Sequence, residues 1–371
     1  MQWDLFCRVI DNFGDVGVCW RLAAELGRRG QQVRLWIDDA SALAWMAPRG
    51  APGVQVVAWT DPAPDLAAGE VVIEAFGCDP PPAFVARMAA LAHAEGAAPV
   101  WINLEYLSAE PYAARSHGLP SPQFSGPGAG LRKWFFYPGF TPVTGGLMQA
   151  GAGGVDGGVD GVAARAWARS QGWAGRPGER VVTLFCYANP ALPGLLAALA
   201  DQPTLLRVPL GAVMAELTKP ALPPGMRVLA LPYLAQPDFD RLLASADLNI
   251  VRGEDSFVRA QVCSGQPLLW QIYPQHDAAH SPKLLAFLAL YLAGWPAPLA
   301  ALVRQAFLAF NNVAPGPLTL PDASDWPAWA ACHTRWRRGL LAQPDLCDRL
   351  QSFVADKLAD KQAEASAQAP T

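Results

Sequence analysis

Two carboxylates and two glycines follow the first apolar segment of the chain, in the run Asp11-Asn12-Phe13-Gly14-Asp15-Val16-Gly17. Open α/β sheets bind ligands beyond the carboxyl ends of their strands, so this position favours a functional site. The GxxG spacing is close to that of a dinucleotide loop, but the first glycine is missing and two aspartates would repel a diphosphate. Paired carboxylates suit a general base or a bound cation; alternatively, Asn12 or Asp15 only caps the following helix.

A second boundary between strand, turn and helix, from Asp247 to Gln261, contains the run Arg252-Gly253-Glu254-Asp255-Ser256. Backbone N–H groups at a helix N-terminus can bind a phosphate, and the Arg252 guanidinium adds a charged fork. Either Asp255 or Ser256 can cap this helix, whereas Glu254 beside an anion is costly unless it has a role of its own. The alternative is a capping box with an internal Arg–Glu pair and no ligand.

Aromatic residues at two further strand ends offer stacking surfaces. The run Tyr233-Leu234-Ala235-Gln236, with Phe239 after it, combines a ring, backbone amides and a carboxamide, which can stack on and recognise a pyrimidine. Phe185 and Tyr187 lie in another expected strand, 181–187, and could supply further ring contacts, although Phe185 alternates with its neighbours as a buried strand residue would. Taken alone, each of these segments is more typical of a packed core than of a binding site.

Metal and nucleophile motifs are sparse. His276 and His280 have the i, i+4 spacing of a helical metal pair, but Asp277 is the only acid near them, and we expect turn or surface histidines. The seven cysteines are odd in number and show no CxxC spacing, which predicts free thiols rather than disulfides or a zinc site. The sequence contains no GxSxG elbow, P-loop or kinase motif set, so serine hydrolysis and P-loop chemistry have no support.

The composition is that of a globular chain: 371 residues, 52% hydrophobic and 16% charged. This length predicts two domains, and the apolar content excludes wholesale disorder. A net charge of −4 gives no general attraction for nucleic acid or an anionic membrane, so we expect neither partner. The first residues lack a signal-peptide pattern, which favours a cytoplasmic protein.

Apolar periodicity predicts alternating strands and helices, restarting after a Gly-rich run at 149–162 that is expected to be a flexible loop. The uncharged segment 284–303 contains Pro296 and Pro298, which predicts two buried helices joined at Gly294 to Pro296 rather than a membrane span. Strands are expected at 3–10, 33–37, 54–59, 71–76, 100–104, 181–187, 205–210, 228–231, 248–251 and 268–273, with helices at 84–93, 193–200 and 239–246.

This alternation predicts the α/β class and a GT-B-like architecture, in which two Rossmann-like domains face a cleft. We expect an N-terminal domain at 1–170 and a C-terminal domain at 178–344. An amphipathic helix at 345–363 is expected to return to the N-terminal domain, followed by a solvated tail at 364–371. Periplasmic-type binding proteins and several epimerases share this outline, so the fold alone does not decide the function.

Several long runs of the chain match one family. They are Trp3–Cys7, Val9–Leu22, Val72–Cys78, Trp101–Glu110, Phe136–Phe140, Thr144–Gly146, Leu184–Tyr187, Val251–Gln261 and Ile272–Gln275. Together they resemble, nearly end to end, the bacterial elongation factor P (EF-P) arginine rhamnosyltransferases, the EarP family.

The resemblance implies an inverting GT-B glycosyltransferase that uses neither metal nor cofactor. Such an enzyme moves L-rhamnose from dTDP-β-L-rhamnose to one arginine of EF-P, which activates EF-P to rescue ribosomes stalled at polyproline. EF-P would face the N-terminal domain, and the nucleotide sugar would lie on the C-terminal one. An arginine guanidinium keeps its proton to a pKa above about 12, so carboxylates must hold and activate it.

The resemblance also implies roles for individual residues. Asp11, Asp15 and Glu254 are expected to be catalytic, with Asp15 favoured as the base. Tyr233 stands where phenylalanine is common in the family, which keeps the stacking ring. The donor is expected to contact Asn12, Phe13, Gly14, Gly17, Phe185, Tyr187, Tyr233, Leu234, Gln236, Phe239, Arg252, Glu254, Asp255 and Ser256.

Two other classes share the expected fold. A nucleotide-sugar epimerase would alter the sugar without a protein acceptor. A non-catalytic nucleotide-sugar-binding protein would close two lobes over its ligand and form no product. Neither alternative accounts for the sequence resemblance.

Overall fold

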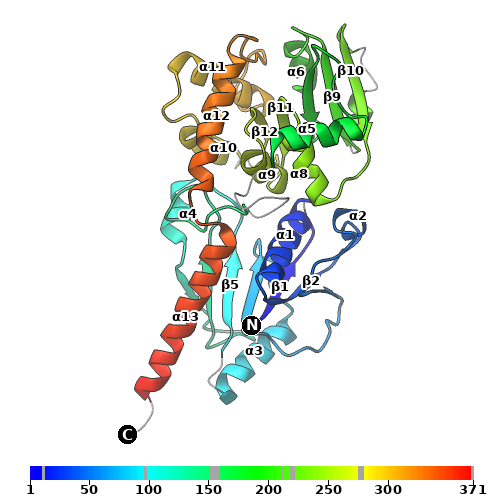
Figure 1. Ribbon diagram of the computed structural model, residues 1–371. Coiled ribbons are helices and arrows are strands. Elements are labelled where there is room, and N and C mark those ends of the chain that lie inside the picture. Colours follow the sequence, from blue (N-terminus) through cyan, green and yellow to red (C-terminus); the bar gives the residue numbers. More distant parts are fainter. Residues whose placement is uncertain are drawn as a thin grey trace. The chain divides into compact units, whose positions relative to one another are not determined.

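The computed structural model describes residues 1–10, 13–95, 98–149, 159–210, 212–217, 222–274 and 280–368. The chain divides into two compact units (Figure 1). Unit 1 comprises 1–148 and 343–371, and unit 2 comprises 149–342. Each unit has its own sheet, so the two expected α/β domains are present.

Within the described ranges, unit 1 is built on a seven-stranded sheet in the order β3-β2-β1-β4-β5-β7-β6. All neighbouring strands are parallel except β6 and β7, which pair antiparallel at one side. The parallel strands therefore end at a common carboxyl edge. The strands are β1 (Gln2–Cys7), β2 (Gln32–Ile37), β3 (Val54–Ala58), β4 (Val71–Ala75), β5 (Val100–Leu104), β6 (Pro120–Pro122) and β7 (Arg132–Phe136).

Aromatic side chains fill one side of this sheet. Phe6 stacks on Trp36 with 5.1 Å between ring centroids, and Phe84 meets both rings edge-on. Residues buried this completely stabilise a fold by roughly 1.5–3 kcal/mol each. The helices of unit 1 are α1 (Gly14–Arg28), α2 (Leu43–Met46), α3 (Pro82–Glu95), α4 (Pro111–Ser116) and α13 (Leu346–Gln368).

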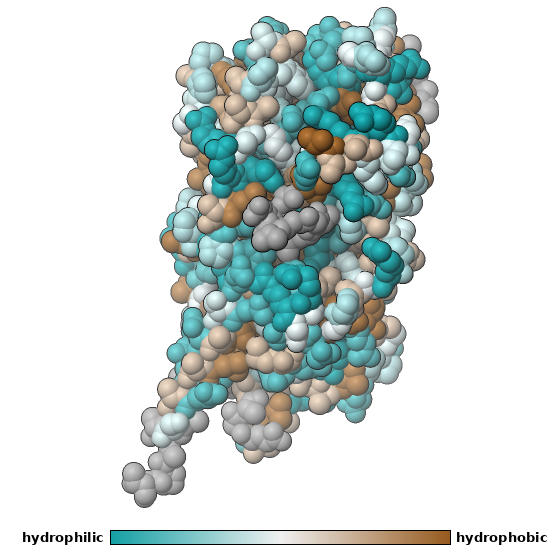
Figure 2. All heavy atoms as spheres, viewed as in Figure 1, coloured by the Kyte–Doolittle hydropathy of each residue, from teal (hydrophilic) through white to brown (hydrophobic). Residues whose placement is uncertain are grey.

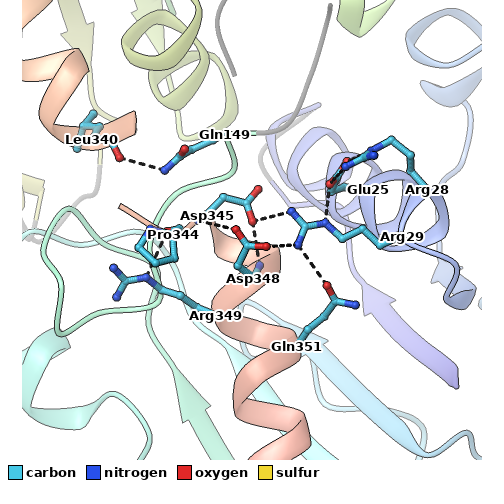
Figure 3. A network of polar contacts seen from close by, with 10 residues as sticks. All are labelled: Glu25, Arg28, Arg29, Gln149, Leu340, Pro344, Asp345, Asp348, Arg349 and Gln351. Carbon is cyan, nitrogen blue, oxygen red and sulfur yellow. Dashed lines mark hydrogen bonds and ion pairs between the residues drawn. The ribbon is translucent and has the colours of Figure 1, made fainter. Parts of the chain in front are cut away.

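The C-terminal helix α13 is fastened to α1 by a polar network around Arg29 (Figure 3). The Arg29 guanidinium bonds to the Asp345 carboxylate at 3.0 Å, to Asp348 at 2.5 Å and, within α1, to Glu25 at 2.6 Å. Arg349 in α13 donates to the carbonyl oxygen of Thr144, which joins this helix to the end of the 1–148 segment of unit 1. The C-terminal helix thus packs on the N-terminal unit, as its amphipathic pattern and place in the chain predicted.

Unit 2 carries a five-stranded parallel sheet in the order β10-β9-β8-β11-β12, counted over the described ranges. Its strands are β8 (Arg180–Leu184), β9 (Thr204–Pro209), β10 (Met226–Leu231), β11 (Leu248–Arg252) and β12 (Leu268–Gln271). Phe257 stacks on Trp270 at 3.8 Å and Phe287 meets both. The helices are α5 (Gly161–Ser170), α6 (Leu192–Ala198), α7 (Ala212–Leu217), α8 (Gln236–Ala244), α9 (Asp255–Cys263), α10 (His280–Tyr291), α11 (Ala297–Phe310) and α12 (Trp326–Leu341).

The boundary between the units differs from the expected one. Helix α5, placed in the N-terminal domain by the 1–170 expectation, belongs to unit 2 because it packs against α8. Arg165 in α5 also pairs with Asp247 at 3.1 Å. The return to unit 1 begins at Gln343, which donates to the Phe140 carbonyl oxygen at 3.0 Å, so 343 and 344 do not belong to the second domain.

Two segments expected to be irregular are partly helical. The Gly-rich run was expected to extend through 162, but α5 begins at Gly161 because the Asp160 side chain accepts the Val162 N–H at 2.9 Å. Residues 150–158 of that run lie outside the described residues. The expected tail at 364–371 is helical as far as Gln368, since alanine, glutamate and glutamine are strong helix formers.

Other expectations are confirmed. All seven cysteines are free thiols. The uncharged segment forms α10 and α11, separated by a turn that contains Gly294 at φ 71°. In the part of the chain that the structure describes, no helix is long and apolar enough to cross a membrane. Figure 2 shows hydrophilic and hydrophobic residues interspersed over the visible face rather than one continuous apolar expanse.

Candidate functional site

The glycine loop of unit 1 joins β1 to α1 at the carboxyl edge of the sheet. Asp15 lies in the first turn of α1 and is only 4% exposed, and its Oδ2 accepts the Ile10 N–H at 2.9 Å. The N-cap residue of α1 is Phe13, which makes no side-chain cap bond, and the Gly17 N–H donates to the Phe13 carbonyl oxygen at 3.0 Å. A carboxylate at a helix N-terminus is stabilised in its charged form.

The structure excludes the helix-capping role that was the alternative for Asp15 and shows what holds Phe13 in place. Asp15 does not act as the N-cap, the role that was the alternative to a functional one, because its carboxylate turns back to the end of the strand segment. The Phe13 ring packs edge-on against Trp45 at 5.2 Å, which fixes the start of the helix beside Gly14. Asp11 and Asn12 lie outside the described residues.

In unit 2, Arg252 lies against two aromatic rings. The guanidinium carbon is 4.4 Å from the Phe185 ring centroid and 4.6 Å from that of Tyr187, the range of a cation–π contact. This is a consequence of strand order: Arg252 ends β11, the rings follow β8, and the two strands are adjacent and parallel. A cation held between rings at a strand end can bind an anionic group beside a planar one.

The backbone around Arg252 is fixed by β12. Gly253 has φ 60°, a conformation that favours glycine, and its carbonyl oxygen accepts the Trp270 indole N–H at 2.7 Å. The Gln271 side-chain oxygen accepts the Tyr187 N–H at 2.7 Å. The turn that carries the guanidinium is therefore rigid on both sides.

The start of α9 differs from the expected cap. Neither Asp255 nor Ser256 is the N-cap residue; Glu254 holds that position without a side-chain cap bond. The Ser256 hydroxyl instead donates to the Arg252 carbonyl oxygen at 2.5 Å and accepts the Arg252 N–H at 3.1 Å. Ser256 thus holds the turn closed, and Glu254, Asp255 and Arg252 bring two negative charges and one positive charge to the helix start.

A second loop enters the same edge of the unit 2 sheet before α8. Tyr233 is exposed, Gln236 is buried as the first residue of α8, and Leu234 lies between them. One turn later Phe239 packs edge-on against Phe185 at 5.5 Å, which links this loop to the Arg252 cluster. The donor residues expected in unit 2 therefore come from strand ends on one sheet, whereas Phe13, Gly14 and Gly17, also expected to contact the donor, lie at the start of α1 in unit 1.

Helices α8 and α9, which carry these two loops, are locked by a fully buried ion pair. The Arg259 guanidinium contacts the Asp240 carboxylate through bonds of 3.1 and 3.0 Å. Burial alone would lower the pKa of Arg259, but the Asp240 carboxylate raises it above its ordinary value. Removing one partner of such a pair leaves an uncompensated buried charge, so the pair fixes how the two helices pack.

Some residues at these edges were not singled out from sequence. Tyr273 follows β12 and meets Tyr187 edge-on at 5.5 Å, and Gln271 holds the Tyr187 backbone. The signal was an aromatic residue at the end of an expected strand, because Tyr273 ends the one at 268–273 as Tyr187 ends the one at 181–187. His276 and Asp277 lie outside the described residues, and His280 begins α10. Among residues that are described, no group of three or more His, Cys, Asp or Glu side chains could hold a metal ion.

The two α/β units, one on a mostly parallel sheet and one on a fully parallel sheet, give the chain the GT-B fold of glycosyltransferases. The calicheamicin glycosyltransferase CalG4 shares the fold, with a TM-score of 0.50 at 16% identity over 95% of this chain and 98% of that chain.

The particular family follows from closer relatives. The family described as Elongation-Factor P (EF-P) rhamnosyltransferase EarP matches residues 3–355, and the chain belongs to this family. A protein-arginine rhamnosyltransferase of Pseudomonas aeruginosa is 44% identical over 96% of this chain and 100% of its own length, and one of Pseudomonas putida is 43% identical over 96% and 99%. A solved structure concerned with EarP-mediated arginine glycosylation of translation elongation factor EF-P has a TM-score of 0.62 at 30% identity, covering 96% of this chain and 99% of that one.

Proposed function

We propose that this enzyme transfers L-rhamnose from dTDP-β-L-rhamnose to the guanidino group of one arginine of EF-P, with inversion at the anomeric carbon. The observation that carries this function is the family match over residues 3–355, supported by a relative that aligns along its whole length. EF-P is a translation factor, so we also propose a cytoplasmic location and no nucleic-acid or membrane partner. The wider consequence is that modified EF-P would rescue ribosomes stalled at polyproline.

The donor is assigned to unit 2. Tyr233, Leu234, Gln236 and Phe239 supply a ring, apolar surface and a carboxamide for the thymine base. Phe185 and Tyr187 hold the Arg252 guanidinium, whose charge meets the diphosphate together with the N–H groups at the start of α9. Asp255 and Ser256 shape this turn, and Glu254 is available for sugar hydroxyls.

The acceptor is assigned to unit 1, where Asp15 and Asp11 orient the arginine. The Asp15 carboxylate takes one proton from the guanidinium, and the freed nitrogen attacks the anomeric carbon from the face opposite dTDP. The new bond joins nitrogen to the anomeric carbon, and the bond from that carbon to the diphosphate oxygen breaks. The rhamnosylated guanidinium regains the positive charge, while the negative charge on the departing dTDP is balanced by Arg252 and the α9 N-terminus.

We propose that no metal takes part. In many phosphate sites a cation balances the leaving diphosphate, and here the Arg252 guanidinium and helix amides supply that role. Transfer at an undiminished rate after treatment with a chelator is the expected result.

The test is the intact mass of EF-P after incubation with the purified enzyme and dTDP-β-L-rhamnose, beside an EF-P whose acceptor arginine is replaced by lysine. One deoxyhexose added only to the arginine form, with an α-linkage by NMR, is expected. A change in the nucleotide sugar without EF-P would instead support an epimerase. Donor binding with no product in either sample would support a binding protein.

A further inference from the structure

A polar and aromatic cluster at the carboxyl edge of the unit 1 sheet has no role in the function proposed above. In one row across the sheet, Phe6, Glu74, Asn103 and Phe135 lie side by side on adjacent strands. The backbone ladder continues beyond the strand ends, because the Phe76 N–H donates to the Leu104 carbonyl oxygen and the Glu105 N–H to that of Phe136. Glu105 is therefore held at the rim of the sheet between the ends of β4 and β7.

Two aromatic pairs flank Glu105. Phe76 and Tyr106 stack with 4.4 Å between centroids and 14° between planes. Tyr112 in α4 meets Tyr137 edge-on at 5.7 Å. Both Tyr106 and Tyr112 are exposed, at 39% and 42%, so the rings line a surface rather than a core. Phe76 has φ 59°, a strained conformation for a residue other than glycine, and the stack against Tyr106 depends on it.

The carboxylates in this cluster outnumber the cations. Lys133 is bound to the buried Glu74 carboxylate at 2.5 Å and lies 3.5 Å from Asp79. Glu105 accepts the Asn103 side-chain N–H at 2.8 Å and a backbone hydrogen bond from Tyr106, and it forms no ion pair within the described part of the chain. Burial raises the pKa of Glu105, and these two hydrogen bonds and the more distant Lys133 offset this only in part.

The side-chain amide that binds Glu105 also has an oxygen without a donor among the described residues. The Asn103 side-chain oxygen is buried and accepts no hydrogen bond from any described residue, although the other end of the same amide binds Glu105. Buried carbonyl oxygens without a donor are rare and costly in native proteins. The site thus offers the Glu105 carboxylate and exposed ring faces, and Lys133, the described cation that acts on Glu105, is already bound to Glu74.

We propose that Glu105, with the Phe76–Tyr106 and Tyr112–Tyr137 rings, binds a second cationic side chain of the acceptor protein, distinct from the arginine that receives the sugar. A guanidinium fits this chemistry best, because it stacks on ring faces and donates in a fork to a carboxylate. Strand β5 lies two strands from β1, about 10 Å away. One guanidinium therefore cannot contact groups at the ends of both strands. Because the cation is assigned to EF-P, this site rests on the function proposed above.

The test compares Glu105→Gln with Asp65→Asn as a matched control. Glutamine keeps the shape of the side chain and its acceptor for Asn103, so the variant is expected to fold. Asp65 is 88% exposed in the connection between β3 and β4 and pairs with Arg87, and its replacement removes the same charge elsewhere on unit 1. The readouts are the Kd and KM for EF-P and the KM for dTDP-β-L-rhamnose.

The expected result for Glu105→Gln is about a tenfold rise in Kd and KM for EF-P with an unchanged donor KM, since one charge-assisted bond is worth at least about that factor. Asp65→Asn should change neither value by more than about twofold. Equal values for the two variants would overturn the proposed site. If wild-type enzyme adds no sugar to EF-P, the proposed function itself fails, which is a separate outcome.

The acceptor variant distinguishes the two cations. With an EF-P whose acceptor arginine is replaced by alanine, Glu105→Gln should still weaken binding about tenfold, because the two effects are independent. If Glu105→Gln no longer weakens binding of this EF-P variant, Glu105 contacts the acceptor arginine itself, and the proposal of a second cation is wrong. Tyr106→Leu, which removes the exposed stacking ring, should weaken EF-P binding in the same direction.

Discussion

Asp15 combines burial with a position at the start of α1, and at the residue scale this makes it the clearest test of the transfer chemistry. Asp15→Asn keeps an oxygen for the Ile10 N–H but cannot accept a proton. We expect turnover to fall roughly 10²–10⁴-fold with unchanged dTDP binding, as is typical for loss of a general base. The measurement is the initial rate of mass addition to EF-P, beside dTDP titration by calorimetry.

Asp38→Asn is the matched control for this change. Asp38 also accepts a backbone N–H of the β1–α1 connection, that of Val9 at 3.0 Å, and it lies on the neighbouring strand end. Its replacement should leave turnover within about twofold. If Asp15→Asn turns over at the wild-type rate with donor bound, the proton goes to another group.

Arg252 makes a second prediction at this scale, on donor affinity. Arg252→Lys keeps the charge but loses the planar group that lies against Phe185 and Tyr187. We expect dTDP to bind about tenfold more weakly, since a cation–π contact of this kind contributes about 1–2 kcal/mol. Calorimetric Kd values for dTDP provide the measurement. Arg165→Lys, in an exposed pair on the same unit, should not alter the Kd, and equal values in both variants would contradict the role of the planar group.

Residue types near strand ends could be predicted from sequence, because a strand followed by glycine and charged residues marks a ligand edge. That pattern located Asp15 and Arg252. It did not show whether Ser256 contacts the donor or holds the turn closed. That distinction depends on the hydrogen bonds between the Ser256 hydroxyl and the Arg252 backbone. Such a bond depends on the three-dimensional turn, not on residue type.

At the scale of elements, strands with continuous apolar runs were predicted to within a few residues. The short antiparallel pair β6 and β7 was not, since Pro120 and Pro122 are atypical of strands and Lys133 interrupts the apolar pattern. Helix α12 was also missed, although its buried residues Trp329, Cys332, His333 and Leu340 recur at helical spacing. The antiparallel pair depended on tertiary packing, whereas α12 had a local signal that the sequence analysis did not use.

His333 gives a pH prediction for the packing of α12. Its Nδ1 pairs with the Tyr291 hydroxyl at 2.9 Å and its Nε2 with the Ser264 carbonyl oxygen at 3.2 Å. Burial lowers the pKa of His333 from 6.5 to about 4. The unfolded chain therefore takes up a proton more readily, and the stability that this histidine contributes is present above pH 6.5 and is lost as the pH falls towards 4.

The expected loss is at most about 3.4 kcal/mol across that window, at about 1.36 kcal/mol for each of its 2.5 pH units. Urea unfolding at pH 7 and pH 4.5 should show a smaller pH dependence for His333→Gln than for wild type. His117 in unit 1, whose pKa burial also lowers to about 4, remains in both proteins and cancels in the comparison. The same pH dependence in both would mean that His333 does not titrate in this range.

At the scale of the whole molecule, the sequence predicted two α/β domains and a returning helix, but it did not predict which side chains meet across a sheet. Glu105 and Phe76 are 29 positions apart in the chain and become neighbours only through the pairing of β4 with β5. The register of paired strands is set by how their buried side chains pack. A cluster built from four segments of the chain is therefore visible only in the folded unit.

The two units are expected to divide the substrates between them, and hydrogen–deuterium exchange tests this division. Saturating dTDP should slow exchange in the segments of unit 2 around Phe185, Gln236 and Arg252, because a ligand that binds only the folded state stabilises the backbone it orders. EF-P should slow exchange in unit 1, around Asp15 and from Glu105 to Tyr112. With Glu105→Gln the protection at 105–112 should be lost at an EF-P concentration near the wild-type Kd, while the dTDP footprint persists. Protection by EF-P confined to unit 2 would show that the acceptor and donor assignments are reversed.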